Sequence, residues 1–204
     1  IILIIISKQM KQMKQMKQMK QVKLKNFIWR QWRKWSFLTS CFVKNALINF
    51  EGVNRRFSFL SSYNGVKIYD DYGHHPVEIR STLSAARDVA KNKGIAVVQP
   101  HRYSRLKMLF ADFTTAFNDA DTVFITDIYS AGESNLDDIN KEALISALIA
   151  GGHKDAREFE SLDKLEDFVI KNLDEGDVVI FLGAGDITQT AKKFSDNLKE
   201  EEKR

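Results

Sequence analysis

From Gly65 onward, short apolar runs alternate with segments whose apolar residues recur at helical spacing. The runs predict strands at residues 66–69, 95–99, 122–127, 157–160 and 178–182. Three of these runs are almost wholly apolar, which is typical of strands that are covered on both faces. The alternation predicts an α/β domain of roughly 140 residues with a doubly wound, mostly parallel, Rossmann-like sheet, and this length is sufficient to bury a core.

The segments between these strands predict helices. In three of them the apolar residues fall at positions i, i+4, i+7 and i+11: Ile79, Leu83, Ala86 and Ala90; Leu106, Phe110, Phe113 and Phe117; Ile187, Ala191, Phe194 and Leu198. Two further helices are predicted at residues 139–149 and 162–173. Pro76 suits the first position of a helix, because its missing N–H has no helical partner there.

Residues 1–44 have a different composition from the rest of the chain. They contain eleven Lys or Arg and no Asp or Glu, whereas the other 160 residues contain 20 basic and 27 acidic side chains. The basic pI of about 9.0 therefore comes from this segment alone, and it does not indicate nucleic-acid binding by the remainder. The apolar run at residues 1–6 is too short to span a bilayer and precedes the basic residues, unlike a signal peptide.

Three interpretations of residues 1–44 stay open. The unit Lys-Gln-Met repeats from Lys8 to Lys20. On an α-helix each three-residue repeat is displaced by about 60° around the helix axis, so the methionines form no continuous apolar face that could pack in a core. This is typical of low-complexity, disordered sequence. The basic repeats and three tryptophans could instead form a helix on a membrane or nucleic acid. A frameshift or truncation is the third explanation. Cys41 is the only cysteine, so no disulfide framework is expected, which favours a reducing cytoplasm.

Polar side chains gather directly after four of the predicted strands, at residues 70–75, 99–105, 127–133 and 183–186. Parallel strands end at the same edge of a sheet, and α/β proteins bind their ligands outside that edge. We therefore expect the four clusters to converge on one functional site.

Two pairs of charged residues in these clusters each have two interpretations. Arg102 and Arg105 lie three apart at a predicted helix start, where both guanidinium groups could bind one carboxylate or phosphate. Alternatively, they form a surface pair that balances the acidic domain. Asp70 and Asp71 could accept hydrogen bonds from ribose hydroxyls or hold a cation, or they could cap the next helix or pair with an arginine.

Other patterns in the clusters are less specific. His74, His75 and His101 lack the helical spacings of a metal site, and none is predicted. The tight turn at residues 183–186 could bind an anion or could allow close helix-to-strand packing. The sequence contains no phosphate loop of the Gly-x-x-x-x-Gly-Lys-Ser/Thr type and no Gly-x-Gly-x-x-Gly, so a complete nucleotide-hydrolysing enzyme is not expected.

Five ordered motifs carry a family resemblance: GVNRRF (52–57), DDYGHHP (70–76), QPHRYSR (99–105), YSAGE (129–133) and GAGD (183–186). In this order and spacing they resemble the C-terminal domain of the Mur ligases of peptidoglycan synthesis. Within that family they are most similar to the branch that joins L-alanine to UDP-N-acetylmuramate. The resemblance covers residues 46–198.

The resemblance implies a cytoplasmic enzyme of three domains: one for the UDP-sugar, a central ATPase domain with the phosphate loop and Mg²⁺ ligands, and a C-terminal domain that closes over both. ATP would phosphorylate the muramate carboxylate, and the amine of L-alanine would attack the acyl phosphate. On this basis residues 1–44 are foreign to the family, 45–60 are the end of the central domain and the hinge, 61–198 are the C-terminal domain and 199–204 are a charged tail.

The resemblance also assigns residues to ligands. ATP would be contacted by Arg56 and Asp71, and the Mg²⁺ ligands would lie outside this chain. L-Alanine would be bound by Tyr72, His74, His101, Arg102 and Arg105.

We expect this polypeptide alone to have no ligase activity and to contact neither nucleic acid nor membrane. The alternatives are a non-enzymatic module that complements separate Mur ligase domains, and the product of a non-functional gene remnant.

Overall fold

A six-stranded sheet organises the part of the chain that the structure describes, residues 55–135 and 139–203 of a computed structural model. The strand order is β1-β2-β6-β3-β4-β5. All neighbouring pairs are parallel except β1 and β2, which form an antiparallel hairpin. The strands are β1 (Ser58–Tyr63), β2 (Val66–Asp71), β3 (Gly94–Val98), β4 (Thr122–Ile125), β5 (Ala156–Glu158) and β6 (Val178–Leu182). The interpretations of residues 1–44 lie outside the described residues.

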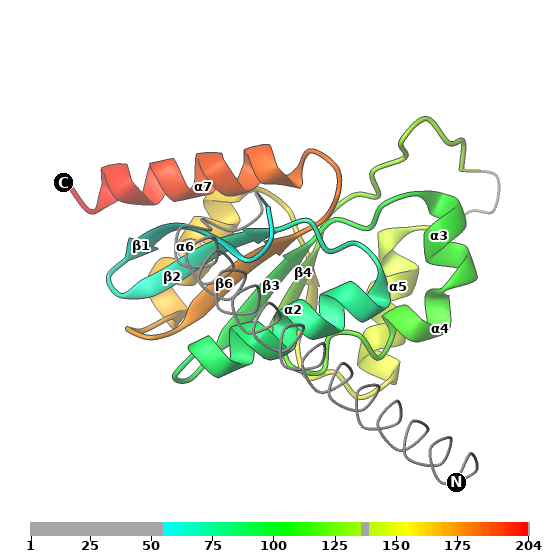
Figure 1. The fold of residues 1–204 in the computed structure, drawn as a ribbon, viewed down its shortest axis with the longest axis horizontal. Helices are drawn as coiled ribbons and strands as arrows, with labels where there is room; N and C mark the ends of the chain where they lie inside the picture. The colour runs from blue at the N-terminus through cyan, green and yellow to red at the C-terminus, as the bar shows by residue number, and fades with distance from the viewer. Residues whose placement is uncertain (1–54, 136–138, 204) are drawn as a thin grey trace, which may run out of the picture. The chain divides into compact units, whose positions relative to one another are not determined.

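Helices cover both faces of the sheet, as the sequence predicts (Figure 1). Leu83 of α2 and Leu148 of α5 are buried in one apolar cluster with strand side chains. Val169 of α6 and Phe194 of α7 are buried in a second cluster with the alternate strand side chains. The fold is therefore a three-layer sandwich with a doubly wound sheet. The helices are α2 (Pro76–Val89), α3 (Tyr103–Met108), α4 (Phe110–Phe113), α5 (Lys141–Ala150), α6 (Leu162–Asn172) and α7 (Ile187–Glu201).

The start of α2 fixes the turn that follows β2. Pro76 occupies the beginning of the helix, as predicted, and His75 is the N-cap, whose Nδ1 accepts a hydrogen bond from Val77 N. The side chain of Glu78 accepts hydrogen bonds from the backbone N–H groups of His74 and His75. This reciprocal capping box holds residues 74 and 75 in one conformation at the end of the sheet.

Two elements differ from the sequence prediction. The hairpin strand β1 was not predicted, and it crosses the predicted domain boundary between residues 60 and 61, so Ser58–Leu60 belong to the sheet. The single helix predicted through Leu106 and Phe117 is divided into α3 and α4 at Leu109, whose φ of −110° and ψ of 20° are not helical. The division keeps Leu106, Phe113 and Phe117 buried.

The C-terminal helix also extends further than predicted. It continues through Leu198 to Glu201, so the first residues of the predicted charged tail, 199–201, are helical. None of the helices in the described ranges is long and apolar enough to cross a membrane.

Candidate functional site

The four polar clusters meet at the carboxyl edge of the sheet, which confirms the predicted convergence. The backbone N–H of Gly183, after β6, donates to the carbonyl of Asp71 at the end of β2 (3.2 Å). Nε2 of Gln99, after β3, donates to Oδ1 of Asp186 (2.6 Å). The loops after β3 and β4 are joined by a bridge between residues 101 and 129. This edge is therefore one continuous site.

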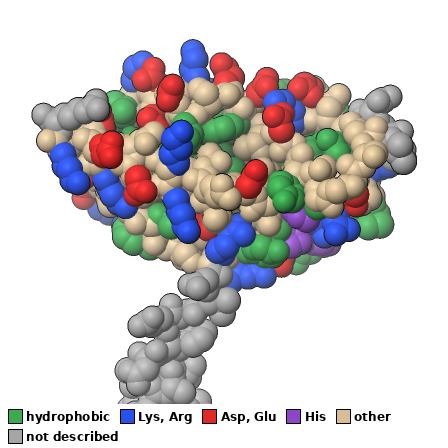
Figure 2. All heavy atoms as spheres, turned by 90° about the horizontal axis from the view of Figure 1, so that it is seen from above, with side chains coloured by type: hydrophobic (Ala, Val, Ile, Leu, Met, Phe, Trp, Pro, Cys, Tyr) green, Lys and Arg blue, Asp and Glu red, His purple; other side chains and the backbone are tan. Residues whose placement is uncertain are grey.

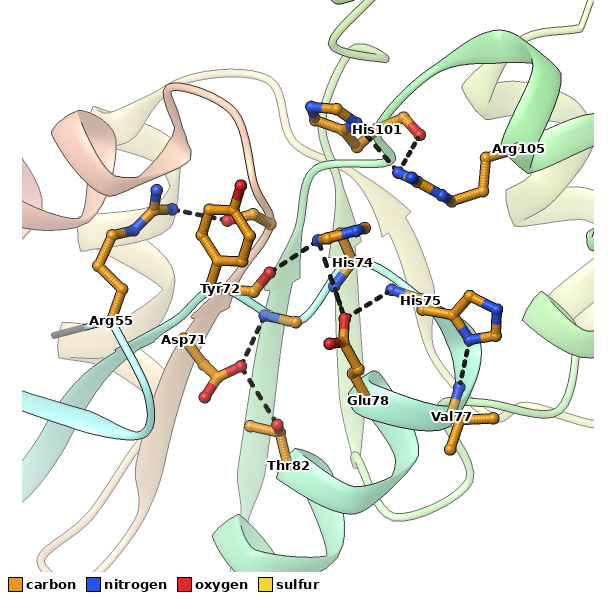
Figure 3. Close-up of polar contacts among 12 residues, drawn as sticks. Arg55, Asp71, Tyr72, His74, His75, Val77, Glu78, Thr82, His101 and Arg105 are labelled. Atoms are coloured by element: carbon orange, nitrogen blue, oxygen red, sulfur yellow. Dashed lines mark hydrogen bonds and ion pairs between the residues drawn. The ribbon is translucent and has the colours of Figure 1, made fainter. Parts of the chain in front are cut away.

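Four rings form a row across this edge. The centroid distances are 5.3 Å from Tyr72 to His74, 5.5 Å from His74 to His101 and 5.3 Å from His101 to Tyr129. Figure 3 shows the first three of these rings side by side. On the face drawn in Figure 2, histidine side chains reach the surface beside Lys or Arg side chains. A ligand from solvent can therefore reach imidazole nitrogens and cations together.

Arg105 fixes the orientation of His101. Its Nη1 donates to Nδ1 of His101 (3.0 Å) and to the carbonyl oxygen of the same residue (3.2 Å). Burial lowers the pKa of His101, and the positive charges of Arg105, His74 and Arg102 lower it further. His101 is therefore a neutral imidazole at pH 7.

Arg102 lies at the start of α3 with its guanidinium half exposed. Its backbone is left-handed (φ 71°), a strained conformation for a residue other than glycine. Nη1 of Arg102 lies 3.6 Å from Oε1 of Glu133, whose carboxylate accepts hydrogen bonds from the backbone N–H (3.0 Å) and hydroxyl (2.7 Å) of Ser104. Those hydrogen bonds hold the pKa of Glu133 below its usual value. The guanidinium keeps donors exposed for a ligand carboxylate or phosphate.

Asp70 is paired with an arginine, which is one of its two predicted alternatives. Oδ2 of the buried Asp70 lies 3.5 Å from Nε of Arg55 and accepts a hydrogen bond from the hydroxyl of Thr188 in α7. Arg55 also donates from Nη2 to the carbonyl oxygen of Gly183 (2.6 Å), and its guanidinium lies 4.8 Å from the ring centroid of Tyr72. Asp70, which lies in β2 and not in the loop after it as predicted, therefore joins this strand to α7 and to the segment that precedes β1.

Asp71 anchors the chain that enters the domain. Its carboxylate accepts hydrogen bonds from Phe57 N (2.7 Å), Gly73 N (2.6 Å) and the hydroxyl of Thr82 (3.3 Å). The residue is only 3% exposed, and Phe57 is held in a left-handed conformation (φ 46°). In this conformation both carboxylate oxygens are occupied, and the contact of Asp71 with ATP stays a prediction.

Arg56 lies beside this anchor at the surface. Its side chain is 47% exposed, and Nη2 is 3.4 Å from Oε1 of Glu78. The guanidinium also lies 5.7 Å from the ring centroid of Tyr72. An exposed guanidinium at this edge fits a phosphate or another anion.

The turn at residues 183–186 allows close packing, as one of its two interpretations predicts. A Cβ atom at Gly185 would overlap the side chain of Gln99 and lie 2.6 Å from Cγ of Tyr129. Within residues 55–135 and 139–203, no group of three His, Cys, Asp or Glu side chains could hold a metal ion.

Sequence reasoning assigned no role to four residues that build this site. They are Arg55, Glu78, Tyr129 and Glu133. Tyr129 and Glu133 belong to the YSAGE motif, and Glu78 lies three residues after the N-cap, which is the spacing of a capping box. These local patterns could have been recognised in the sequence, whereas the contacts between loops could not.

Comparison with known proteins identifies the family. Residues 55–185 match the family described as Mur ligase, glutamate ligase domain, and the chain belongs to the Mur ligase family. It is 48% identical over 162 residues to a UDP-N-acetylmuramate–L-alanine ligase of Brucella anthropi, covering 79% of this chain and 35% of that protein. It is 50% identical over 157 residues to the ligase of the same name from Agrobacterium fabrum, covering 77% and 33%.

A solved structure agrees with these relatives. The crystal structure of the UDP-N-acetylmuramate–alanine ligase of Thermotoga maritima is similar to this chain with a TM-score of 0.60 and 31% identity, covering 77% of this chain and 33% of that one. The chain therefore spans about a third of the length of the relatives that it matches. The similarity supports the predicted fold and the predicted C-terminal part of a Mur ligase.

Proposed function

We propose that residues 58–201 are the C-terminal domain of an ATP-dependent ligase that joins L-alanine to UDP-N-acetylmuramate, and that residues 45–57 lead into it from the central domain. The relatives from Brucella anthropi and Agrobacterium fabrum carry that activity in their names. The observation that carries the proposal is the placement of Arg102 and Arg105 beside a row of imidazole and phenol rings at the carboxyl edge of the sheet.

In this proposal the cations of the edge bind the carboxylate of L-alanine. Arg102 has exposed donors for a two-point contact. Arg105 holds His101 in place through Nδ1, which directs the Nε2–H of that ring to the ligand. Tyr72 and His74 form the wall on the side of β2. Discrimination against glycine depends on burying one methyl group, worth roughly 1 kcal/mol, so it is modest.

ATP is the second proposed ligand. Arg56 fits an ATP phosphate, because its guanidinium is exposed at this edge. Asp71 would reach ATP only after releasing the backbone of Phe57 or Gly73. ATP supplies the phosphoryl group that activates the muramate carboxylate, and Mg²⁺ would be held by residues of the other domains. Closure of the C-terminal domain would exclude water from the acyl phosphate.

A chimera tests the proposal. The C-terminal third of the Agrobacterium fabrum relative is replaced by residues 55–204 of this chain, and phosphate release from ATP is measured with UDP-N-acetylmuramate and L-alanine. We expect L-alanine-dependent turnover from the chimera and none from the 204-residue chain alone. Arg102→Ala should raise the KM for L-alanine at least tenfold, since a charge-assisted contact is lost. Arg80→Ala on the exposed face of α2 is the matched control and should leave KM unchanged.

The two negative results have different meanings. A folded chimera that turns over without L-alanine, or prefers another amino acid, contradicts the proposed substrate. Turnover by the isolated chain contradicts the proposal that the other domains are required.

A further inference from the structure

The tautomers of His74 and His101 are fixed in opposite senses by their hydrogen-bond partners. Nδ1 of His74 lies 3.1 Å from the carbonyl oxygen of Tyr72, which can only accept, so Nδ1 carries the proton of the neutral ring. Nδ1 of His101 lies 3.0 Å from Nη1 of Arg105, which can only donate, so the proton of that ring is on Nε2. His74 therefore offers a lone pair at Nε2, and His101 offers an N–H at Nε2.

These two nitrogens are free to meet a ligand. Within the described residues, neither Nε2 atom has a hydrogen-bond partner. The two rings are 5.5 Å apart, and the side chain of His74 is 20% exposed. An acceptor and a donor at this edge match the two ends of an amino acid, whose ammonium group donates and whose carboxylate accepts.

Glu78 is placed to stabilise a positive charge on His74 (Figure 3). Its Oε2 lies 3.8 Å from Nδ1 of His74 and also accepts the backbone N–H groups of His74 (3.2 Å) and His75 (3.3 Å). Burial alone would raise the pKa of Glu78, but those backbone hydrogen bonds, with the charges of His74 and Arg56, bring it below its usual value. Glu78 is therefore ionised at neutral pH and cannot leave the turn without breaking the helix cap.

We propose that His74 is the general base that removes a proton from the ammonium group of the amino-acid substrate, and that Glu78 is its positioning residue. The inference rests on the proposed function. One N–H bond of the ammonium group breaks and its electron pair stays on nitrogen, while Nε2 of His74 forms the new N–H bond. The resulting amine uses that pair to attack the acyl phosphate. The tetrahedral intermediate collapses as phosphate leaves with the electrons of the broken C–O bond, and the second proton lost by the nitrogen departs with the phosphate.

Charged and titratable groups lie on several sides of His74. Oε2 of Glu78 in α2 lies 3.8 Å from Nδ1 of His74, and Oε1 of the same carboxylate is 3.4 Å from Nη2 of Arg56. Arg105 of α3 lies behind His101, which is neutral. The phenol of Tyr72 meets the ring of His74 edge-on, with an interplanar angle of 84°. The carboxylate beside Nδ1 is the group that would stabilise the protonated base.

Nitrogen-15 NMR of the histidine rings tests the inference on the full chain. At pH 8 and without ligand, we expect His74 to carry its proton on Nδ1 and His101 on Nε2, which the ring ¹⁵N shifts distinguish directly. Saturation with L-alanine should bring its ammonium group to Nε2 of His74 as a hydrogen-bond donor, which moves the ¹⁵N signal of that nitrogen while both rings stay neutral. L-Lactate, which has the carboxylate and methyl but no ammonium group, should shift the His101 signals without moving the Nε2 signal of His74.

Each outcome has one meaning. A proton on Nε2 of free His74, or L-alanine-induced shifts at His101 with none at Nε2 of His74, overturns the base and leaves the amino-acid site standing. If L-alanine shifts no ring signal at any concentration, the amino-acid site itself, and with it the proposed function, is contradicted.

Substitutions distinguish a general-base role of His74 from a purely structural one. His74→Asn keeps a donor for Tyr72 O and lacks Nε2, so the chimera should keep its KM for L-alanine and lose at least 100-fold in kcat. That loss should shrink as the pH rises, because the free amino acid then loses its own proton. Glu78→Gln keeps an acceptor without the charge and should lower kcat while the KM for L-alanine is kept, because the protonated base loses its stabilising carboxylate. His75→Asn keeps the helix cap and should change neither measurement. A kcat loss that is the same at every pH overturns the base.

Discussion

The ring of Tyr129 packs so closely on Gly185 that a Cβ atom at position 185 would lie 2.6 Å from Cγ of the tyrosine. The same ring stacks on His101, with an interplanar angle of 21°. The turn after β6 therefore determines where the imidazole of the turn after β3 lies. Gly185→Ala should displace Tyr129 and lower the free energy of unfolding by about 1–3 kcal/mol, which urea denaturation measures.

Gly94→Ala is the control for that change. A Cβ atom at Gly94 would meet its nearest neighbour at 3.8 Å, an ordinary contact, so the stability should stay within about 1 kcal/mol of the unaltered chain. Equal losses at both positions would show that the close approach of Tyr129 has no special importance. The His101 ring signals should move only in Gly185→Ala.

Asp71→Asn tests the anchor of the entering chain. The amide can replace only one of the two carboxylate oxygens, so an NH₂ group would face the N–H of either Phe57 or Gly73. We expect a loss of about 1–3 kcal/mol in the free energy of unfolding. The exposed Asp196, which pairs only with Lys199 on α7, is the control, and Asp196→Asn should leave the urea midpoint unchanged. An Asp71→Asn protein as stable as the original would contradict the anchoring role.

His101 should make the domain sensitive to acid. Its pKa is lowered in the folded state by burial and by the charges of Arg105, His74 and Arg102, so the unfolded chain takes up a proton at higher pH than the folded one. The folded state should therefore lose stability as the pH falls through about 6.5, the ordinary value for histidine. Urea midpoints between pH 8 and pH 5 measure this loss.

A matched variant isolates the contribution of His101. In His101→Asn the amide oxygen takes the place of Nδ1 as acceptor for Arg105, but the side chain does not titrate. The midpoint should fall less steeply with acid in this variant. Parallel pH profiles for the two proteins would assign the acid sensitivity to other groups.

Lys141 should hold the loop after β4 in place. Its Nζ lies 2.6 Å from both Oδ1 of Asp127 and Oε1 of Glu158, and those hydrogen bonds raise its pKa. Lys141→Met should lower the free energy of unfolding by about 1 kcal/mol, because the lysine side chain is mostly buried while Asp127 is exposed. The same change in an Asp127→Asn background should cost less, and strictly additive losses would show that the pair is not coupled.

The sequence predicted the sheet well because its strands are locally distinct. The β6 segment is apolar throughout and fully buried, and the polar residues after β2, β3, β4 and β6 had to meet once those strands were parallel. The strand β1 was missed because three serines interrupt its apolar pattern. Asn64 and Gly65 both have positive φ (45° and 79°), as a two-residue hairpin turn requires, so the Asn-Gly pair was the signal that could have revealed β1.

The contacts within the site had no such local signal. The pairing of Asp70 in β2 with Arg55, and the stacking of Tyr129 on His101, join segments that are distant in the sequence, and side-chain packing across a folded edge leaves no periodicity in the chain. The division of the helix at Leu109 was equally hidden, since neither glycine nor proline interrupts residues 103–113.

The position of β6 has a consequence for how this domain is made. Among the described residues β6 is the last strand in sequence, yet it lies between β2 and β3 in the sheet. While a ribosome is still synthesising the segment that precedes Val178, the β1-β2 hairpin and the β3-β4-β5 group have no partner strand to join them. Each nascent half then has an open inner edge, which is a template for aggregation. Premature termination before residue 178 should therefore produce a chain that chaperones and proteases recognise, rather than a smaller folded domain.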